Sequence, residues 1–281
     1  MTFPSLPALA LLPLIACATL AAEKPAADKP MLGSKVFKWE ELVVKPTEVG
    51  ERRDVAANPT PTMTELECHI SMLKSGLTSH PPHVHPQEEL IILTEGELEV
   101  YINGATSRIG PGSLFYFSSW DAHNVRSVGA VPARYHVFNF LTPKTRSNPP
   151  YPAATSAAPA MIRSQVFSWD KLPVEKTKVG FRREVLDGPT PTYERIRCHV
   201  TTLNAHEAPH PAHHHPVEEV IMVKEGALDV TINGRTERAS TGSVCFFASN
   251  DEHGLKNAGD APVTYYVIRV DTEATPKAAS L

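Results

Sequence analysis

The sequence predicts an all-β protein in which one barrel or sandwich occurs twice. Turn dipeptides such as "EG" at 95–96 and "NG" at 103–104 separate short apolar runs. Turns recur at intervals of about eight to twelve residues, which is typical of all-β sandwiches and barrels. No long segment has a helical period, and only "KWEEL", 38–42, and "SWDKL", 168–172, fit a helical turn.

The chain repeats itself at a constant offset of 130 residues. "VFKWEEL", 36–42, returns as "VFSWDKL", 166–172. "HPPHVHPQEE", 80–89, returns as "HPAHHHPVEE", 210–219, with seven of ten residues identical. Because no insertion or deletion separates these pairs, we expect a tandem duplication of one domain rather than a solenoid of short repeats.

The repeat predicts where the two domains begin and end. We expect barrels over residues 36–141 and 166–271. Segments 23–35 and 142–165 are predicted linkers, the second rich in Pro and Ala, and 272–281 is a predicted C-terminal tail.

The N-terminal segment predicts export from the cytoplasm. Residues 1–22 carry no charge, and their apolar run is too short for a membrane span and ends in small residues. This favours a signal peptide cleaved near Ala22, and hence a secreted or periplasmic protein, although the usual positive n-region is absent. An alternative is that "LIAC", 14–17, is a bacterial lipobox, so that Cys17 is lipidated and anchors the chain. No integral membrane span is expected in either case.

Composition limits the partners and the role of cysteine. The net charge is -4 with no long basic run, so nucleic acid is not an expected partner. We expect a small-molecule ligand or substrate, and a homo-oligomer remains possible. The cysteines beyond the signal peptide, Cys68, Cys198 and Cys245, are odd in number, so we expect small core residues rather than a disulfide framework.

Each copy offers three imidazoles and one carboxylate at the same spacing. His83 and His85 are two apart on a predicted strand, so both rings face one side. Glu89 opens the next strand, and His123 follows an aromatic strand. The second copy has the equivalent set His213, His215, Glu219 and His253. These donors suit a divalent transition metal (Mn, Fe, Ni, Cu or Zn), so one ion per barrel is predicted.

On these residues the chain resembles a bicupin, a member of the cupin superfamily. The family's first motif is matched by Gly76, His83, His85, Glu89 and Gly96, and in the second copy by His213, His215, Glu219 and Gly226, with His206 in place of the leading Gly. The second motif is matched around His123 and His253. Its Pro-x-Gly element is replaced by Ser118-to-Trp120 and Ala248-to-Asn250, which leaves the shape of the loop before the last histidine open.

The resemblance implies a fold and a range of activities. Each copy would be a double-stranded β-helix, or jelly-roll barrel, with a metal in its mouth and with Ile91, Leu93, Leu98 and Val100 in the interior or between sheets. Bicupins include oxalate decarboxylases, dioxygenases, isomerases and hydrolases. The oxalate enzymes typically carry an arginine just upstream of the His-x-His pair. Here "SGLTSHPP", 75–82, and "NAHEAPHP", 204–211, contain none, so oxalate chemistry is not expected.

The leading hypothesis is a metal-dependent enzyme of dioxygenase or oxidoreductase type that acts on a small organic substrate. The alternative is a non-catalytic module that binds or senses a small ligand or a metal. No catalytic acid or nucleophile, and no organic cofactor site, is identified beside the metal ligands.

Other polar side chains near these motifs receive structural interpretations. We expect His80 and His210 to be exposed in loops, with a partner role beside the ligands as the alternative. Glu88 and Glu218 are expected to face away from the metal into solvent. We expect His69 and His199 to have structural roles on the strand face opposite Cys68 and Cys198. Four arginines are expected to form salt bridges between the copies, with a carboxylate substrate as the alternative: Arg52, Arg53, Arg182 and Arg183. Trp39 and Trp169 are expected to pack over a barrel end.

Overall fold

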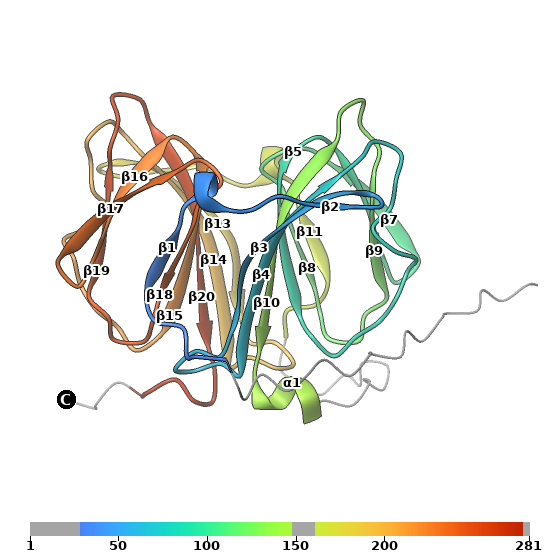
Figure 1. The fold of residues 1–281 in the computed structure, drawn as a ribbon, viewed down its shortest axis with the longest axis horizontal. Coiled ribbons are helices and arrows are strands. Elements are labelled where there is room, and N and C mark those ends of the chain that lie inside the picture. The colour runs from blue at the N-terminus through green and yellow to red at the C-terminus, as the bar shows by residue number, and fades with distance from the viewer. Residues whose placement is uncertain (1–28, 148–160, 278–281) are drawn as a thin grey trace, which may run out of the picture.

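A computed structural model describes residues 29–147 and 161–277, and shows two β-barrels side by side (Figure 1). Within these ranges the only helices are α1 (Pro143–Ser147) and the 3-10 turns η2 (Trp39–Glu41) and η3 (Trp169–Lys171), so the all-β prediction is confirmed. None of these helices could cross a membrane. The predicted signal peptide and the alternative lipid anchor at Cys17 lie outside the described residues.

Each barrel combines a seven-stranded sheet with a three-stranded sheet. The N-terminal barrel has the order β11-β8-β5-β10-β4-β3-β2 in its large sheet and β7-β6-β9 in its small one. Its strands are β2 (Lys45–Thr47), β3 (Gly50–Asn58), β4 (Glu65–Leu73), β5 (Glu89–Glu95), β6 (Leu98–Ile102), β7 (Ala105–Ile109), β8 (Leu114–Phe117), β9 (His123–Ser127), β10 (Ala133–Leu141) and β11 (Gln165–Phe167).

The C-terminal barrel repeats this plan with the orders β1-β18-β15-β20-β14-β13-β12 and β17-β16-β19. Its strands are β1 (Lys35–Phe37), β12 (Glu175–Lys176), β13 (Gly180–Gly188), β14 (Arg195–Leu203), β15 (Glu218–Glu225), β16 (Ala227–Ile232), β17 (Arg235–Ser240), β18 (Val244–Phe247), β19 (His253–Asn257) and β20 (Val263–Asp271).

The first strand of each copy belongs to the barrel of the other copy. β1 pairs with β18, and β11 pairs with β8; Figure 1 shows β1 within the C-terminal half of the molecule. The 3-10 turn that follows β1 places the Trp39 ring over Gly242, and the turn after β11 places Trp169 over Gly112. A Cβ at either glycine would lie 2.7 Å from the indole, so both glycines are required for this contact. The exchange therefore joins the two copies through backbone pairing as well as through side chains.

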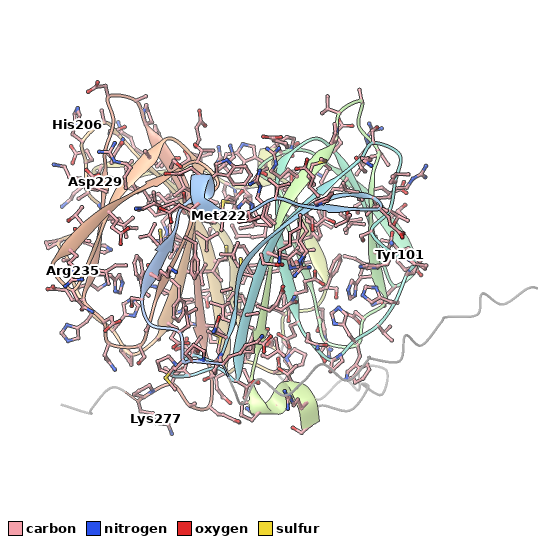
Figure 2. All side chains as sticks on the ribbon, in the orientation of Figure 1. Tyr101, His206, Met222, Asp229, Arg235 and Lys277 are labelled. Atoms are coloured by element: carbon pink, nitrogen blue, oxygen red, sulfur yellow. The ribbon has the colours of Figure 1, made fainter. Side chains whose placement is uncertain are left out.

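The two large sheets pack against each other and form one continuous core. On β5, Leu90 and Ile92 point toward the other barrel, whereas Ile91 and Leu93 point into their own. The shared cluster also contains Met222 and Phe246 of the second copy, and Figure 2 shows Met222 between the two halves. Both faces of these strands are buried, which accounts for continuous apolar runs such as "LIIL", 90–93.

The core residues expected from the sequence are buried. Ile91, Leu93, Leu98 and Val100 belong to the interior cluster of the N-terminal barrel. The three described cysteines are also buried and free, as predicted, and they form no disulfide.

A matched pair of hydrogen bonds links the barrels through His136 and Tyr266. Nε2 of His136 lies 3.1 Å from the carbonyl oxygen of Gly242 and donates to it. At the equivalent position of the second copy, the Tyr266 hydroxyl donates to the carbonyl oxygen of Gly112. Burial lowers the pKa of His136 from its ordinary 6.5 to about 4. The neutral ring is therefore the form that stabilises the contact.

We expect the free energy of unfolding to decrease as the pH is lowered, because of His136. Between about pH 6.5 and pH 4 the unfolded chain binds a proton at this side chain that the folded chain does not, so the free energy of unfolding decreases as pH falls. From pH 7 to pH 4.5 the contribution is on the order of 2–3 kcal/mol. His136→Tyr copies Tyr266 and should remove this part of the pH dependence, as measured by urea denaturation at both pH values. Equal pH dependence in the variant and the parent would contradict the assignment.

Candidate metal centres

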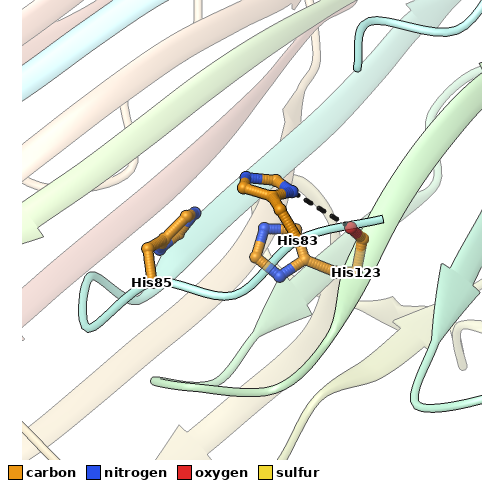
Figure 3. Close-up of side chains that lie close together, drawn as sticks. All are labelled: His83, His85 and His123. Atoms are coloured by element: carbon orange, nitrogen blue, oxygen red, sulfur yellow. Dashed lines mark hydrogen bonds between the residues drawn. The ribbon is translucent and has the colours of Figure 1, made fainter. Parts of the chain in front are cut away.

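Each barrel brings three histidines together at one point. His83 and His85 lie in the loop before β5, and His123 begins β9. The strand expected under His83 and His85 is reduced to a single bridge, in which the backbone N–H groups of His83 and His123 donate to each other's carbonyl oxygen at 3.2 and 3.0 Å. Figure 3 shows the three rings grouped across this bridge. His213, His215 and His253 are arranged in the same way.

The spacing of the histidines suits a single ion in each barrel. The three ligand atoms of each group lie within 4.8 Å of one another. Two ligands on opposite sides of an ion, each at about 2.1 Å, would be about 4.2 Å apart. Each barrel therefore has one three-histidine site that could hold a metal ion, and the predicted histidines of both copies make up these two sites.

Backbone carbonyl groups orient the imidazole rings. Nδ1 of His85 donates to the Gln87 oxygen at 2.9 Å, and Nδ1 of His123 donates to the Asp121 oxygen at 2.8 Å. In the second copy Nδ1 of His215 and of His253 do the same at 2.7 and 2.9 Å. With the proton on Nδ1, the Nε2 lone pair is available to a metal.

Several of these Nε2 atoms are buried without a hydrogen bond. Within residues 29–147 and 161–277 this holds for Nε2 of His123, His215 and His253. Buried polar atoms are nearly always hydrogen-bonded in folded proteins, so buried nitrogens that lack a hydrogen bond and converge fit a metal-binding site. Burial, together with the neighbouring imidazoles, lowers the pKa of His83 and of His213 to about 4, so both are neutral ligands at pH 7.

A carboxylate lies next to each triad. Oε2 of Glu89 is 3.5 Å from Nε2 of both His85 and His123, and Oε2 of Glu219 is 3.5 Å from Nε2 of His215. Burial raises the pKa of Glu89, but His123 and His85 outweigh it and hold the pKa well below its usual range. Burial likewise opposes ionisation of Glu219, yet His215 and Arg269 lower its pKa to about 2. Both are ionised oxygen donors, and their place in the ligand sets stays a prediction.

Part of each triad lines a cavity: His123 in the N-terminal barrel, and His213 and His253 in the C-terminal barrel. The N-terminal cavity measures about 360 Å³ and the C-terminal one about 430 Å³. The apolar side chains of Ile91 and Phe117 line the first, and the Phe117 ring stacks on His123 at a centroid distance of 4.2 Å. Phe247 stacks on His253 at 4.3 Å in the second barrel. The stacked rings restrict the last histidine of each triad to one orientation.

A cupin-domain family model matches residues 69–139 and 199–269, which include both triads and together make up half of the chain. The chain is a bicupin of the cupin family. A sequence comparison with curated proteins finds no match.

Solved structures with a similar fold include two oxalate decarboxylases. The oxalate decarboxylase of Lactobacillus farciminis, solved with formate, has 17% identity and a TM-score of 0.64 over 88% of this chain and 89% of that one. That of Bacillus subtilis, described for its Mn(II) centres, has 17% identity and a TM-score of 0.63 over 90% and 81%. AerE of Microcystis aeruginosa has 14% identity and a TM-score of 0.60 over 82% and 97%. At such low identity the likeness concerns the fold.

The bicupin keeps a glycine-like backbone where the family's Pro-x-Gly element is missing. Trp120 and Asn250 stand in the glycine position and adopt φ of 67° and 64°. Their N–H groups donate to the carbonyl oxygens of His85 and His215 at 2.8 and 2.9 Å. The loop before the last ligand is therefore tied to the loop of the first two.

The prediction that Glu88 and Glu218 face solvent is wrong. They are only 1% and 2% exposed, because the strand face opposite the metal is covered by the other barrel. Glu88 accepts hydrogen bonds from the Tyr116 hydroxyl (2.7 Å) and the Thr192 N–H (2.9 Å). Glu218 accepts from the Thr60 and Thr62 hydroxyls at 2.6 and 2.7 Å. Burial raises the pKa of Glu88 to about 7. The repeated "PTPT" segments thus each bind a carboxylate of the other copy, a role that the sequence analysis missed.

The prediction that the four arginines form salt bridges between the copies is also wrong. Arg52 pairs with Asp54 (2.6 Å) and Glu67 (2.9 Å), and Arg182 pairs with Glu184, all within one barrel. The guanidinium groups of Arg53 and Arg183 lie over Trp39 and Trp169, at 4.3 and 4.4 Å from the ring centroids. Arg52 and Arg182 thus line the cavities, whereas Arg53 and Arg183 pack on the tryptophans of the 3-10 turns η2 and η3.

Four further histidines line the cavities. His80 and His210 are exposed in loops, as predicted, and each also lines its cavity next to the first ligand. His69 and His199 line the cavities too, on the strand face opposite the cysteines. His214 is exposed, and it belongs neither to the triad nor to the cavity wall.

Proposed function

We propose that this bicupin is a metal-dependent oxidoreductase of dioxygenase type that acts on a small organic substrate. The observation that carries the proposal is the convergence of three histidine nitrogens beside a cavity in each barrel. When bound, a divalent transition metal would supply Lewis-acid or redox chemistry at that point. Among Mn, Fe, Ni, Cu and Zn, manganese is the first candidate, because the Bacillus subtilis structure is described for Mn(II) centres.

The side chains of the N-terminal barrel have separate tasks in this proposal. His83, His85 and His123 would hold the ion, with Glu89 as a further donor. The apolar walls around Phe117 keep bulk water away from the reacting atoms. His80 lies at the cavity edge with its ring 4.0 Å from that of His83. Because burial lowers the pKa of His80, it is neutral at pH 7 and can accept a proton there.

Metal content and oxygen consumption test the proposal together. Protein purified without chelator is expected to contain about two transition-metal ions per chain. Oxygen uptake is then followed with a panel of small carboxylates and phenols, oxalate included, after loading with manganese or iron. We expect uptake with at least one substrate, and its loss after treatment with a chelator.

Other results would replace the proposal. A flat oxygen trace with saturable ligand binding would favour the non-catalytic module. Release of carbon dioxide from oxalate without net oxygen consumption would show a decarboxylase, despite the lack of an arginine upstream of either His-x-His pair. A chain without bound metal in a metal-rich medium would overturn both enzyme interpretations and leave only a module that binds a small ligand.

A further inference from the structure

A row of charged side chains crosses the sheet of the C-terminal barrel beside its triad. The strand register places Asp187 opposite Arg197, Arg197 opposite Arg269, and Arg269 opposite Glu219. All four line the cavity. Two like charges directly opposite on neighbouring strands destabilise a sheet unless negative charge compensates them. For Arg197 and Arg269 this charge comes from Asp271 and Glu219, each through one hydrogen bond.

The N-terminal barrel has a different row at the matched positions. There the register aligns Ala57, Glu67, Asn139 and Glu89, which contains two carboxylates and no base. Glu67 stands where Arg197 stands in the second copy. Its oxygens accept from Arg52 at 2.9 Å, from His69 at 2.7 Å and from Asn139 at 2.8 Å. This carboxylate is satisfied within the barrel.

The arginines of the C-terminal row retain free donors. Arg197 donates through Nη2 to Asp271 at 3.0 Å, and its buried Nε has no partner among the described residues. Arg269 donates through Nε to Glu219. Asp187 does not pair with Arg197, because Arg195 holds both of its oxygens at 2.6 and 2.8 Å. A guanidinium offers five N–H donors in a planar fork, so both side chains can bind a further acceptor.

We propose that the C-terminal cavity binds a small carboxylate-bearing ligand, held by the guanidinium groups of Arg197 and Arg269 next to the three-histidine site. This rests on the proposed function in that the ligand would be the substrate or an analogue of it. The fork of a guanidinium matches the two oxygens of a carboxylate, which makes the contact directional as well as electrostatic. The cavity of about 430 Å³ leaves room for the rest of a small organic acid.

The two barrels would then differ in what they accept. In the N-terminal barrel Glu89 lines the cavity and Glu67 lies in the same row, so this wall repels an anion. The only arginine that lines that cavity, Arg52, is already bound to Asp54 and Glu67. In the C-terminal row the positive charges of Arg197 and Arg269 balance the negative charges of Asp187 and Glu219. We therefore expect one carboxylate site per chain rather than two, although the metal triads are alike.

Calorimetric titration of the full metal-loaded chain tests this inference. Acetate, succinate and benzoate serve as probes, with succinamide as the uncharged counterpart and inorganic phosphate as the other oxyanion. We expect saturable binding of at least one carboxylate at one site per chain, no binding of succinamide, and weaker binding of phosphate. Arg197→Gln should weaken carboxylate binding at least about tenfold, since it removes a charge-assisted contact. Glu67→Gln, the matched change in the other barrel, should leave this affinity unchanged.

The outcomes separate this inference from the proposed function. Arg197 is not a metal ligand, so Arg197→Gln should keep the metal content and the melting temperature of the parent within a few degrees. Carboxylate binding without oxygen uptake would support the site and count against the proposed enzyme. Absence of binding by all three carboxylates, equal binding at two sites, tighter binding of phosphate, or an unchanged affinity in Arg197→Gln would overturn the inference even if metal and activity were found.

Discussion

His83→Ala is expected to leave the chain with one bound metal ion instead of two. The ring of His83 is one of three nitrogen donors in the N-terminal barrel, and no other described side chain takes its place. Loss of a group that merely orients a ligand already weakens metal binding by about 10–100-fold, so loss of the ligand itself should exceed about 100-fold. His213→Ala should empty the C-terminal site in the same way. Elemental analysis after dialysis measures both effects.

His214→Ala is the matched control for this experiment. His214 lies between two ligands in sequence, but it is exposed and does not belong to the triad, so its removal should leave both ions in place. Loss of both ions from His83→Ala alone would show that the sites are coupled through the shared core. Two ions retained in His83→Ala would show that this histidine is not a ligand.

Phe246→Ala is expected to destabilise the whole chain, not the C-terminal barrel alone. Phe246 is fully buried in the cluster that contains residues of both copies. Truncation of a buried phenylalanine typically costs about 3–5 kcal/mol, through lost transfer free energy and a residual cavity. Because the barrels also exchange their first strands, we expect a single cooperative unfolding transition that shifts as a unit. Urea denaturation followed by far-UV circular dichroism and by tryptophan fluorescence measures the shift.

Phe181→Ala serves as the reference for that measurement. Phe181 lies on β13 with its side chain exposed, so the same truncation should change the free energy of unfolding by no more than about 0.5 kcal/mol. Two separate transitions in Phe246→Ala, with only one displaced, would mean that the barrels fold independently and that their contact contributes little.

Much of the metal site could be predicted because its information is local. The His-x-His spacing, the following glutamate and the later histidine occur twice at one offset, and an accidental surface cluster would not repeat in that way. The prediction that His83 and His85 lie on a regular strand is wrong. Pro81, Pro82 and Pro86 around them cannot donate to a ladder, and the structure keeps only the single bridge to His123.

The exchange of the first strands, β1 and β11, between the barrels could not be predicted from the sequences of these strands. "VFKW" and "VFSW" differ at one position, and their partner strands β18 and β8 are both short, apolar and buried. Local sequence therefore permits pairing within or between copies. Backbone hydrogen bonds do not distinguish the two arrangements. The choice depends on how the turns at Trp39 and Trp169 pack over glycines of the opposite barrel.

Side-chain alternation and ligand spacing are short-range properties, so the amino-acid order was sufficient to establish the duplication, the all-β class and the two histidine triads. It also indicated that Glu88 faces away from Glu89, because neighbours on a strand point to opposite sides. Only the tertiary structure decided what surrounds Glu88 on that face. A second sheet, encoded about 130 residues away, covers the face and buries a carboxylate that was expected at the surface. The contrast between Glu67 and Arg197 is visible in the printed letters. Its meaning depends on the strand register, which places each residue in the row that leads to the glutamate beside a triad, and on the fold, which places Arg197 at the wall of a cavity.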